Sequence, residues 1–160
     1  MHGKFNNLSP YAEIRGVGSF SEGVKTGEWE EYYTSTEGSL ERSQTGAYQF
    51  GKKVGTWSLY AKNGRRIAEG TFKDNVKEGE WTEGQYIDFG SRFFGKGTYS
   101  NNEKNGSWSY VAPRQNPTIE GFFTNGEPSG EWKVVYNKRT YKGSLADLKK
   151  KVPKLNEYSF

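Results

Sequence analysis

Lysine occupies one position of a pattern that recurs along the chain, and an ammonium group repeated at a regular spacing suits the recognition of anions. The lysines each lie seven residues after a glycine, at Lys25, Lys53, Lys77 and Lys104, and Pro128 holds the fifth such position. On stacked β-hairpins, equivalent positions project the same way at intervals of about 10 Å. The spacing therefore predicts a row of positive charge along one edge. The alternative is that a lysine beside a turn only keeps an edge soluble.

The chain offers little for catalysis. Its single histidine, His2, lies next to the N-terminus and there is no cysteine, so neither a Ser/His/Asp triad nor a histidine or thiolate metal site is expected. Glu28, Glu80 and Glu131 recur in one Gly-Glu-Trp context. This regularity indicates repeat structure, because a catalytic pair of acids needs two different environments. We therefore expect no enzyme activity, no cofactor and no metal.

These lysines and glutamates belong to a longer repeat. All five tryptophans stand two residues after a glycine, another glycine stands nine residues before that one, and Phe or Tyr follows the earlier glycine by two residues. The unit therefore reads Gly-x-aromatic, six residues, Gly-x-Trp. Its aromatic positions, which we expect to form the core, are Phe20, Trp29, Tyr48, Trp57, Phe72, Trp81, Tyr99, Trp108, Phe123 and Trp132.

Each unit is expected to be a β-hairpin. Five residues after the first glycine stands Gly or Asn, the residues that best tolerate a positive φ, at Gly23, Gly51, Asn75, Asn102 and Gly126. A loop centred on that residue and the one after it sets each first glycine opposite the tryptophan and each first aromatic opposite the second glycine. Side chains alternate along a strand, so one face of the sheet is predicted to be aromatic and the other polar.

Hairpins joined in sequence predict an all-β fold, an elongated antiparallel meander of about five stacked hairpins over residues 16–143. The composition agrees, because aromatic residues make up 16% of the chain and glycines number 21, while all hydrophobic residues make up only 32%. A β-sandwich would need more aliphatic residues. Loss of one tryptophan, such as Trp81, is expected to lower the melting temperature of the array.

The ends of the chain lack the repeat and are predicted to cap the array. Residues 1–15 are expected to supply an edge strand or a covering segment. Residues 144–160 are expected to hold a short helix that Ser144 caps, with Asp147 in its first turn, and that ends at Pro153.

The charge balance permits an anionic partner without requiring one, because 23 basic and 19 acidic residues give a net charge of +4. No apolar run approaches the roughly 20 residues of a membrane span, and no basic-then-apolar leader is present. We expect the chain to be soluble and cytoplasmic. No recognised nucleic-acid motif accompanies the basic residues, so no specific nucleic acid is expected as a partner.

Aromatic residues outside the repeat positions form a second candidate surface. Tyr60 follows a tryptophan by three residues, while Tyr86 and Phe93 lie in the long insertion after the third tryptophan. Tyrosine-rich surfaces favour recognition, so Tyr60, Tyr86 and Phe93 are predicted to join the four lysines in binding a partner. The alternative is that these rings only complete the core.

The pattern Gly-x-[Phe/Tyr], a turn Gly or Asn, then Gly-x-Trp, with tryptophans 24 to 28 residues apart, resembles the MORN-variant repeat family of bacteria. That family includes antitoxin-like members of toxin–antitoxin pairs. The resemblance covers residues 16–143, although only Asn125-Gly126 keeps the Asn-Gly turn typical of the family. The resemblance implies stacked hairpins and a binding or scaffolding role.

Three classes of function follow from these patterns. The first is a protein-interaction module, most concretely an antitoxin-like or immunity-like inhibitor that binds an acidic protein such as a toxin or effector. The second is a peripheral adaptor that binds anionic membrane lipids through the lysine edge. Self-association through an open edge strand belongs with the first class, and an enzyme is the least favoured.

Overall fold

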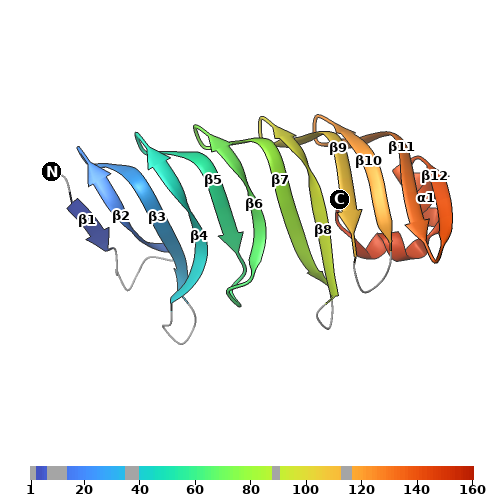
Figure 1. Cartoon of the computed structure of the whole chain (residues 1–160), viewed down its shortest axis with the longest axis horizontal. Coiled ribbons are helices and arrows are strands. Elements are labelled where there is room, and N and C mark those ends of the chain that lie inside the picture. The colour runs from blue at the N-terminus through green and yellow to red at the C-terminus, as the bar shows by residue number, and fades with distance from the viewer. Residues whose placement is uncertain (1–2, 7–13, 35–39, 88–90, 113–116) are drawn as a thin grey trace. The chain divides into compact units, whose positions relative to one another are not determined.

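The protein is an all-β antiparallel meander of hairpins with a short helix near the C-terminus, which confirms the predicted fold class (Figure 1). The chain forms two compact units, Met1–Glu78 and Gly79–Phe160, and each has buried aromatic residues of its own. The computed structural model describes residues 3–6, 14–34, 40–87, 91–112 and 117–160.

In the first unit, strands that follow one another in the chain are neighbours in the sheet. These strands are β1 (Gly3–Asn6), β2 (Ile14–Ser21), β3 (Val24–Thr34), β4 (Leu40–Gln49), β5 (Lys52–Tyr60) and β6 (Arg66–Lys73). Strand β7 (Val76–Ile87) begins in this unit and continues into the second. The segment expected to cap the N-terminal end contains β1, which pairs antiparallel with β2.

The second unit repeats this arrangement. Its further elements are β8 (Ser91–Ser100), β9 (Glu103–Val111), β10 (Thr118–Thr124), β11 (Glu127–Tyr136), β12 (Arg139–Gly143), the α-helix α1 (Leu145–Lys151) and the 3₁₀-helix η1 (Pro153–Glu157). Along β10 the residues alternate strictly between exposed and buried. Phe122 follows this alternation but is unusual as an aromatic residue on the polar face, where it is 53% exposed.

The hairpin turns lie one residue earlier than expected. In the turn between β2 and β3, Glu22 and Gly23 have φ values of 52° and 81°. Two successive residues of positive φ make the turn type that matches the twist of paired strands. Phe20 therefore pairs with Lys25 rather than with the second glycine of its repeat. The predicted pairing of aromatic with glycine is wrong within this hairpin.

That pairing occurs instead between consecutive hairpins. Tyr48 of β4 pairs with Gly27 of β3, and Gly46 pairs with Trp29. Strands β5 and β6 repeat the arrangement, and so do β7 and β8. The pairing of the first glycine with the tryptophan of its own hairpin is also present, as predicted, because Gly97 pairs with Trp108 in β8 and β9. Contacts of a large residue with glycine therefore occur both within a hairpin and between consecutive hairpins.

The two glycines of the repeat have different physical roles. At a first glycine such as Gly46, a Cβ atom would lie 2.4 Å from the Trp57 ring, so only glycine leaves room for the indole. At a second glycine such as Gly55, φ is +67° and nothing lies within 4 Å of a Cβ position. Glycine is needed there for the left-handed backbone and not for packing.

Aromatic rings form a ladder on one face of each unit. In the first unit the rings of Phe20, Trp29, Tyr48, Trp57 and Phe72 meet edge to face, with successive centroids 5.1 to 6.1 Å apart. In the second unit, the same geometry joins Tyr99 to Trp108 and Phe123 to Trp132. All five tryptophans are at most 3% exposed. Edge-to-face contacts add to the gain from burial, so each ring depends on its neighbours.

The indole N–H groups satisfy backbone carbonyls where the hairpins are irregular. Trp29 donates to the carbonyls of Ser19 and Thr26 at 3.2 and 3.1 Å, next to a register shift between β2 and β3. Trp108 donates to the carbonyl of Thr98 at 3.0 Å. A phenyl ring could fill part of the same space but could not make these bonds, which explains the choice of tryptophan.

The predicted C-terminal helix is confirmed. Ser144 is the N-cap of α1, and its Oγ accepts a hydrogen bond from the backbone N–H of Asp147 at 3.2 Å. The helix ends at Lys151, before Pro153. Leu148 is fully buried, and α1 packs on β11 and β12.

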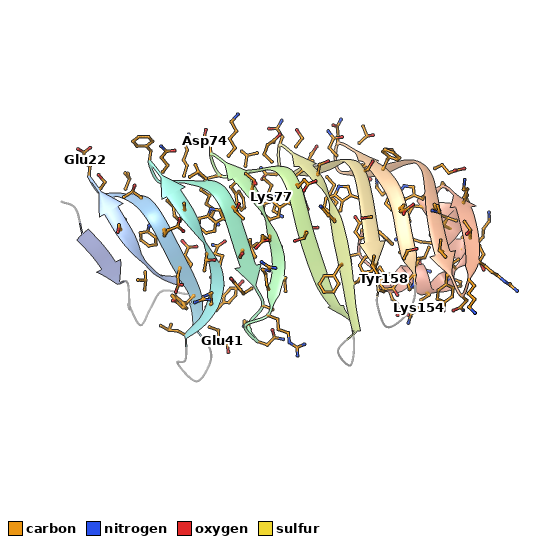
Figure 2. All side chains as sticks on the ribbon, viewed as in Figure 1. Glu22, Glu41, Asp74, Lys77, Lys154 and Tyr158 are labelled. Carbon is orange, nitrogen blue, oxygen red and sulfur yellow. The ribbon has the colours of Figure 1, made fainter. Side chains whose placement is uncertain are left out.

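The residues after the helix cover part of the aromatic face of the second unit. Tyr158, labelled in Figure 2, stacks on Phe93 with centroids 4.3 Å apart. Phe160 meets Tyr110 and Trp132 edge to face at 5.2 and 5.8 Å. The aromatic face at these strands is therefore core, and a partner cannot bind to it there without displacing the C-terminus.

Candidate functional site

Three of the four predicted lysines, Lys25, Lys53 and Lys104, lie on the aromatic face. Lys25 precedes Trp29 by four residues, an even number, so strand alternation puts both on one face. Its Nζ lies 4.3 Å from the Trp29 ring and 4.8 Å from the Tyr48 ring, within the range of cation–π attraction. Lys53 Nζ likewise lies 4.4 Å from the Trp57 ring.

Lys104 has the same placement in the second unit. Its Nζ lies 4.5 Å from the Trp108 ring, and its side chain is 15% exposed. Lys77, labelled in Figure 2, is half-buried near the start of β7. Lys25, Lys53 and Lys104 therefore stabilise the aromatic face and do not form the solvent-facing row of charge that their spacing predicted.

A buried carboxylate holds these lysines in the first unit. Glu31 is 4% exposed, and its Oε1 lies 2.5 Å from Lys25 Nζ and 3.0 Å from the Tyr48 hydroxyl. Gln44 donates to the other oxygen and accepts from Lys53 Nζ at 2.7 Å. We call these five side chains the Glu31 network.

The network fixes the charge of its members. Burial alone would raise the pKa of Glu31, but the hydrogen bonds from Lys25, Tyr48 and Gln44 and the charge of Lys25 hold that pKa below its usual value. Burial and the neighbouring Glu31 carboxylate raise the pKa of Tyr48. Glu31 is therefore ionised and Tyr48 protonated at neutral pH, which suits a structural network and not an acid–base pair.

This lowered pKa makes part of the stability of the first unit dependent on pH. A depressed folded-state pKa contributes stability above the unfolded-state value, and that stability is lost as the pH falls through the folded pKa. We expect the loss to begin near pH 4.5, the ordinary value. Glu31→Gln should be less stable at neutral pH and should lose less on acidification. Urea unfolding from neutral pH to about pH 3 measures both effects.

A matched variant separates this effect from general acid sensitivity. Glu28→Gln alters an exposed carboxylate of the same strand, so we expect it to keep the pH dependence of the unaltered protein. If Glu31→Gln and Glu28→Gln declined with the same slope as the unaltered protein, the network would not be the source of the acid sensitivity.

Glu83 holds the corresponding place in the second unit. Its carboxylate accepts a hydrogen bond from the Tyr99 hydroxyl at 2.5 Å and lies 3.4 Å from Lys104 Nζ. Glu31 and Glu83 each follow a tryptophan by two residues, on the aromatic side of the strand. Carboxylate, lysine and tyrosine thus form a recurring, partly buried group.

The three aromatic residues that were predicted to bind a partner lie in different environments. Phe93 is 2% exposed and stacked between Tyr110 and Tyr158, so it belongs to the core and is not accessible to a partner. Tyr86 lies in β7, and its side chain falls outside the described residues. Tyr60 is half-buried at the end of β5, where it has charged neighbours.

A row of alternating tyrosine and arginine side chains crosses the first unit around Tyr60. Tyr32 of β3 pairs in register with Arg42 of β4, and Tyr60 of β5 pairs with Arg66 of β6. The Arg42 guanidinium lies 5.6 Å from the centroid of the Tyr60 ring, which joins the two pairs. We call these four residues the Tyr/Arg row. The arginine side chains are 45% and 56% exposed, and the tyrosines are half-buried.

Two glutamates orient the row. Arg42 Nη2 lies 3.1 Å from Glu30 Oε1, and the Tyr32 hydroxyl donates to the other oxygen of Glu30. Acceptance of that bond by Glu30 raises the pKa of Tyr32. Arg66 pairs with Glu69 in the same way. Exposed ion pairs add little stability, but these restrict side chains that would otherwise sample many rotamers.

β-Bulges explain why sequence analysis missed the row. The register shifts directly before Tyr32 and again directly before Tyr60, and a bulge re-aims the side chains beyond it. A sequence signal does exist. In the first two repeats, tyrosine stands three residues after the tryptophan, and arginine stands four residues before the first glycine of the next repeat.

Each unit also has an open hollow on its surface. In the first unit a hollow of about 420 Å³ is lined by Val17, Glu30 and Thr45 among others, and Glu30 joins it to the Tyr/Arg row. In the second unit a hollow of about 740 Å³ is lined by Phe122 and by two cross-strand ion pairs, Glu80–Lys96 and Glu120–Lys133. The hollow of the first unit therefore adjoins the Tyr/Arg row and adds to the surface that a partner could contact there.

The described residues contain no group of three or more His, Cys, Asp or Glu side chains placed to hold a metal ion. Nor does any helix in that part of the chain have the length and apolar character needed to cross a bilayer. No protein-family model matches the sequence, and no curated protein matches it. The functional proposal rests on the geometry of the Tyr/Arg row.

Proposed function

We propose that this chain is a non-enzymatic protein-interaction module that recognises its partner through the Tyr/Arg row. Tyrosine and arginine are enriched among the residues that dominate binding energy at protein interfaces. The row lies on paired strands, and Glu30 and Glu69 orient its arginines. Side chains that are already oriented lose little conformational freedom on binding, which favours affinity.

An acidic partner fits the distribution of charge. Residues 137–160 contain seven basic and two acidic residues, a net of +5, whereas the whole chain has a net charge of only +4. Such a basic end attracts an acidic protein over a distance and speeds its association. We therefore propose an antitoxin-like or immunity-like inhibitor of an acidic toxin or effector, and propose membership of the MORN-variant repeat family from its glycine and tryptophan pattern.

Affinity capture from a lysate of the source cell tests this proposal, with the unaltered chain as bait. Tyr60→Ala and Arg42→Ala are each expected to reduce the captured partner by about tenfold or more, as loss of a central interface residue does. Phe122→Ala is the matched control, because it removes an exposed aromatic ring from the second unit and leaves the row intact.

The lysines of the aromatic face are unsuitable for such a test. A glutamate at Lys25 would lie beside Glu31 and would destabilise the unit, so loss of the partner would say nothing about binding. If both row variants had the circular dichroism of the unaltered protein and still captured the same partner in full, the row would not be the contact surface.

A second candidate function is binding to anionic membrane lipids, which the basic C-terminal end favours. We expect the chain to sediment with vesicles that contain phosphatidylserine and not with phosphatidylcholine alone. Reversal of exposed Lys150 and Lys151 to glutamate should reduce sedimentation, while reversal of exposed Lys52 and Lys62 should not. Absence of sedimentation with either vesicle would eliminate this function.

A further inference from the structure

We infer that the Tyr/Arg row binds a proline-rich segment in the polyproline II conformation, an inference that rests on the proposed function and specifies the partner segment. Tyr32 and Tyr60 lie two strands apart, in β3 and β5, which corresponds to about 9.6 Å at a strand spacing of about 4.8 Å. A polyproline II helix has three residues per turn and rises about 3.1 Å per residue, or about 9.3 Å per turn. Two rings at that spacing can contact equivalent faces of successive turns.

Other backbone conformations fit the row less well. Along an extended strand, side chains on one face repeat every ~6.6 to 6.8 Å. An α-helix repeats every ~5.4 Å, and its backbone groups are already bonded to one another. The carbonyl groups of a polyproline II helix have no internal partner, so they present acceptors to hydrogen-bond donors on a binding surface.

The row supplies both kinds of contact that such a segment needs. The rings of Tyr32 and Tyr60 offer flat apolar surfaces on which proline rings pack, as in other proteins that bind proline-rich segments. Arg42 lies between them, against the Tyr60 ring, and its guanidinium has five N–H groups. Arg42 contacts Glu30 through Nη2, and its guanidinium also interacts with the side chains of Tyr32 and Tyr60.

The charge of the row favours a neutral segment over a nucleic acid. Glu30 and Glu69 pair with Arg42 and Arg66, so the row and its two glutamates have no net charge. Binding to a phosphate backbone depends on positive charge that displaces counterions. A proline-rich segment needs no such charge, because it is recognised by ring packing and by hydrogen bonds to its carbonyls.

Titration of the ¹⁵N-labelled chain with a decaproline peptide, followed by NMR, tests this inference. We expect saturable shifts of backbone signals in β3 to β6, around the row. Tyr60→Ala should weaken binding about tenfold or more. Arg42→Lys, which keeps the charge but loses the planar group, should weaken it severalfold. Phe122→Ala should bind as the unaltered protein does.

Several results would overturn the inference. These are the absence of saturable shifts, shifts away from the row, equal binding of a Gly/Ser decamer, binding only of a polyglutamate decamer, or full binding by both row variants. If decaproline failed while capture of a lysate protein still depended on Tyr60, the row would be an interaction surface for another class of segment. If capture showed no dependence on the row, the proposed function itself would fail.

Discussion

Gly46→Ala is expected to destabilise the first unit by about 3 kcal/mol, the upper end of the usual effect of overpacking a core. The added Cβ would lie 2.4 Å from the Trp57 ring. That ring cannot retreat easily, because it is fully buried, meets Tyr48 and Phe72 edge to face, and its N–H is bonded to the carbonyl of Ala47. Urea unfolding followed by tryptophan fluorescence measures the change.

The second glycine of the same repeat provides the control. At Gly55, φ is +67° and a Cβ would have open space around it. Asparagine tolerates that backbone better than alanine does, so Gly55→Asn should cost about 1 kcal/mol or less, and less than Gly55→Ala. At Gly46 the order should reverse, because the larger side chain has less room. The same order of the two substitutions at both sites would contradict the separate roles assigned to the two glycines.

The fold could be predicted because the spacing of the repeat indicates both where the chain turns and which residues pack against each other. Residues that accept a positive φ recur at the turns, and a ring recurs beside a glycine. The predicted register of each hairpin was wrong by one residue. The recurring Gly or Asn marks the turn, but the sequence does not indicate whether it is the first or the second residue of a two-residue turn. Glu22 and Phe50 take the first turn position at φ values of 52° and 48°, where few residues other than glycine are found.

The site was harder to predict because its geometry depends on the register between strands. Strand alternation alone could have placed Lys25 on the face of Trp29. The contacts of Glu31 with Gln44 and Tyr48 require the β3–β4 register, which the shifted turns and the bulge before Tyr32 determine. The residues after η1 lie outside the repeat, so no repeat pattern indicates their course. The contacts of Tyr158 and Phe160 with the aromatic face of the second unit could therefore not be predicted from the sequence.

Trp108→Ala is expected to destabilise the second unit by about 3 to 5 kcal/mol, the usual range for loss of a buried tryptophan. The indole is 1% exposed, meets Tyr99 and Phe123 edge to face, and lies under the Lys104 ammonium. Its removal leaves these neighbours, and Tyr110 which stacks on it, with unfilled contacts, and it leaves the Thr98 carbonyl without its donor. The melting temperature should fall by roughly 10 °C or more, and Trp81→Ala should act in the same direction.

Trp108→Phe distinguishes the two contributions of the indole. Phenylalanine retains an edge-to-face ring between Tyr99 and Phe123 but cannot donate to the Thr98 carbonyl, so it should cost about 1 to 3 kcal/mol, less than alanine. Calorimetry of the two variants beside Phe122→Ala, whose ring is 53% exposed, gives the comparison. An unchanged melting temperature in Trp108→Ala would contradict the ladder as the core, since a ring that supports its neighbours on both sides cannot be removed without cost.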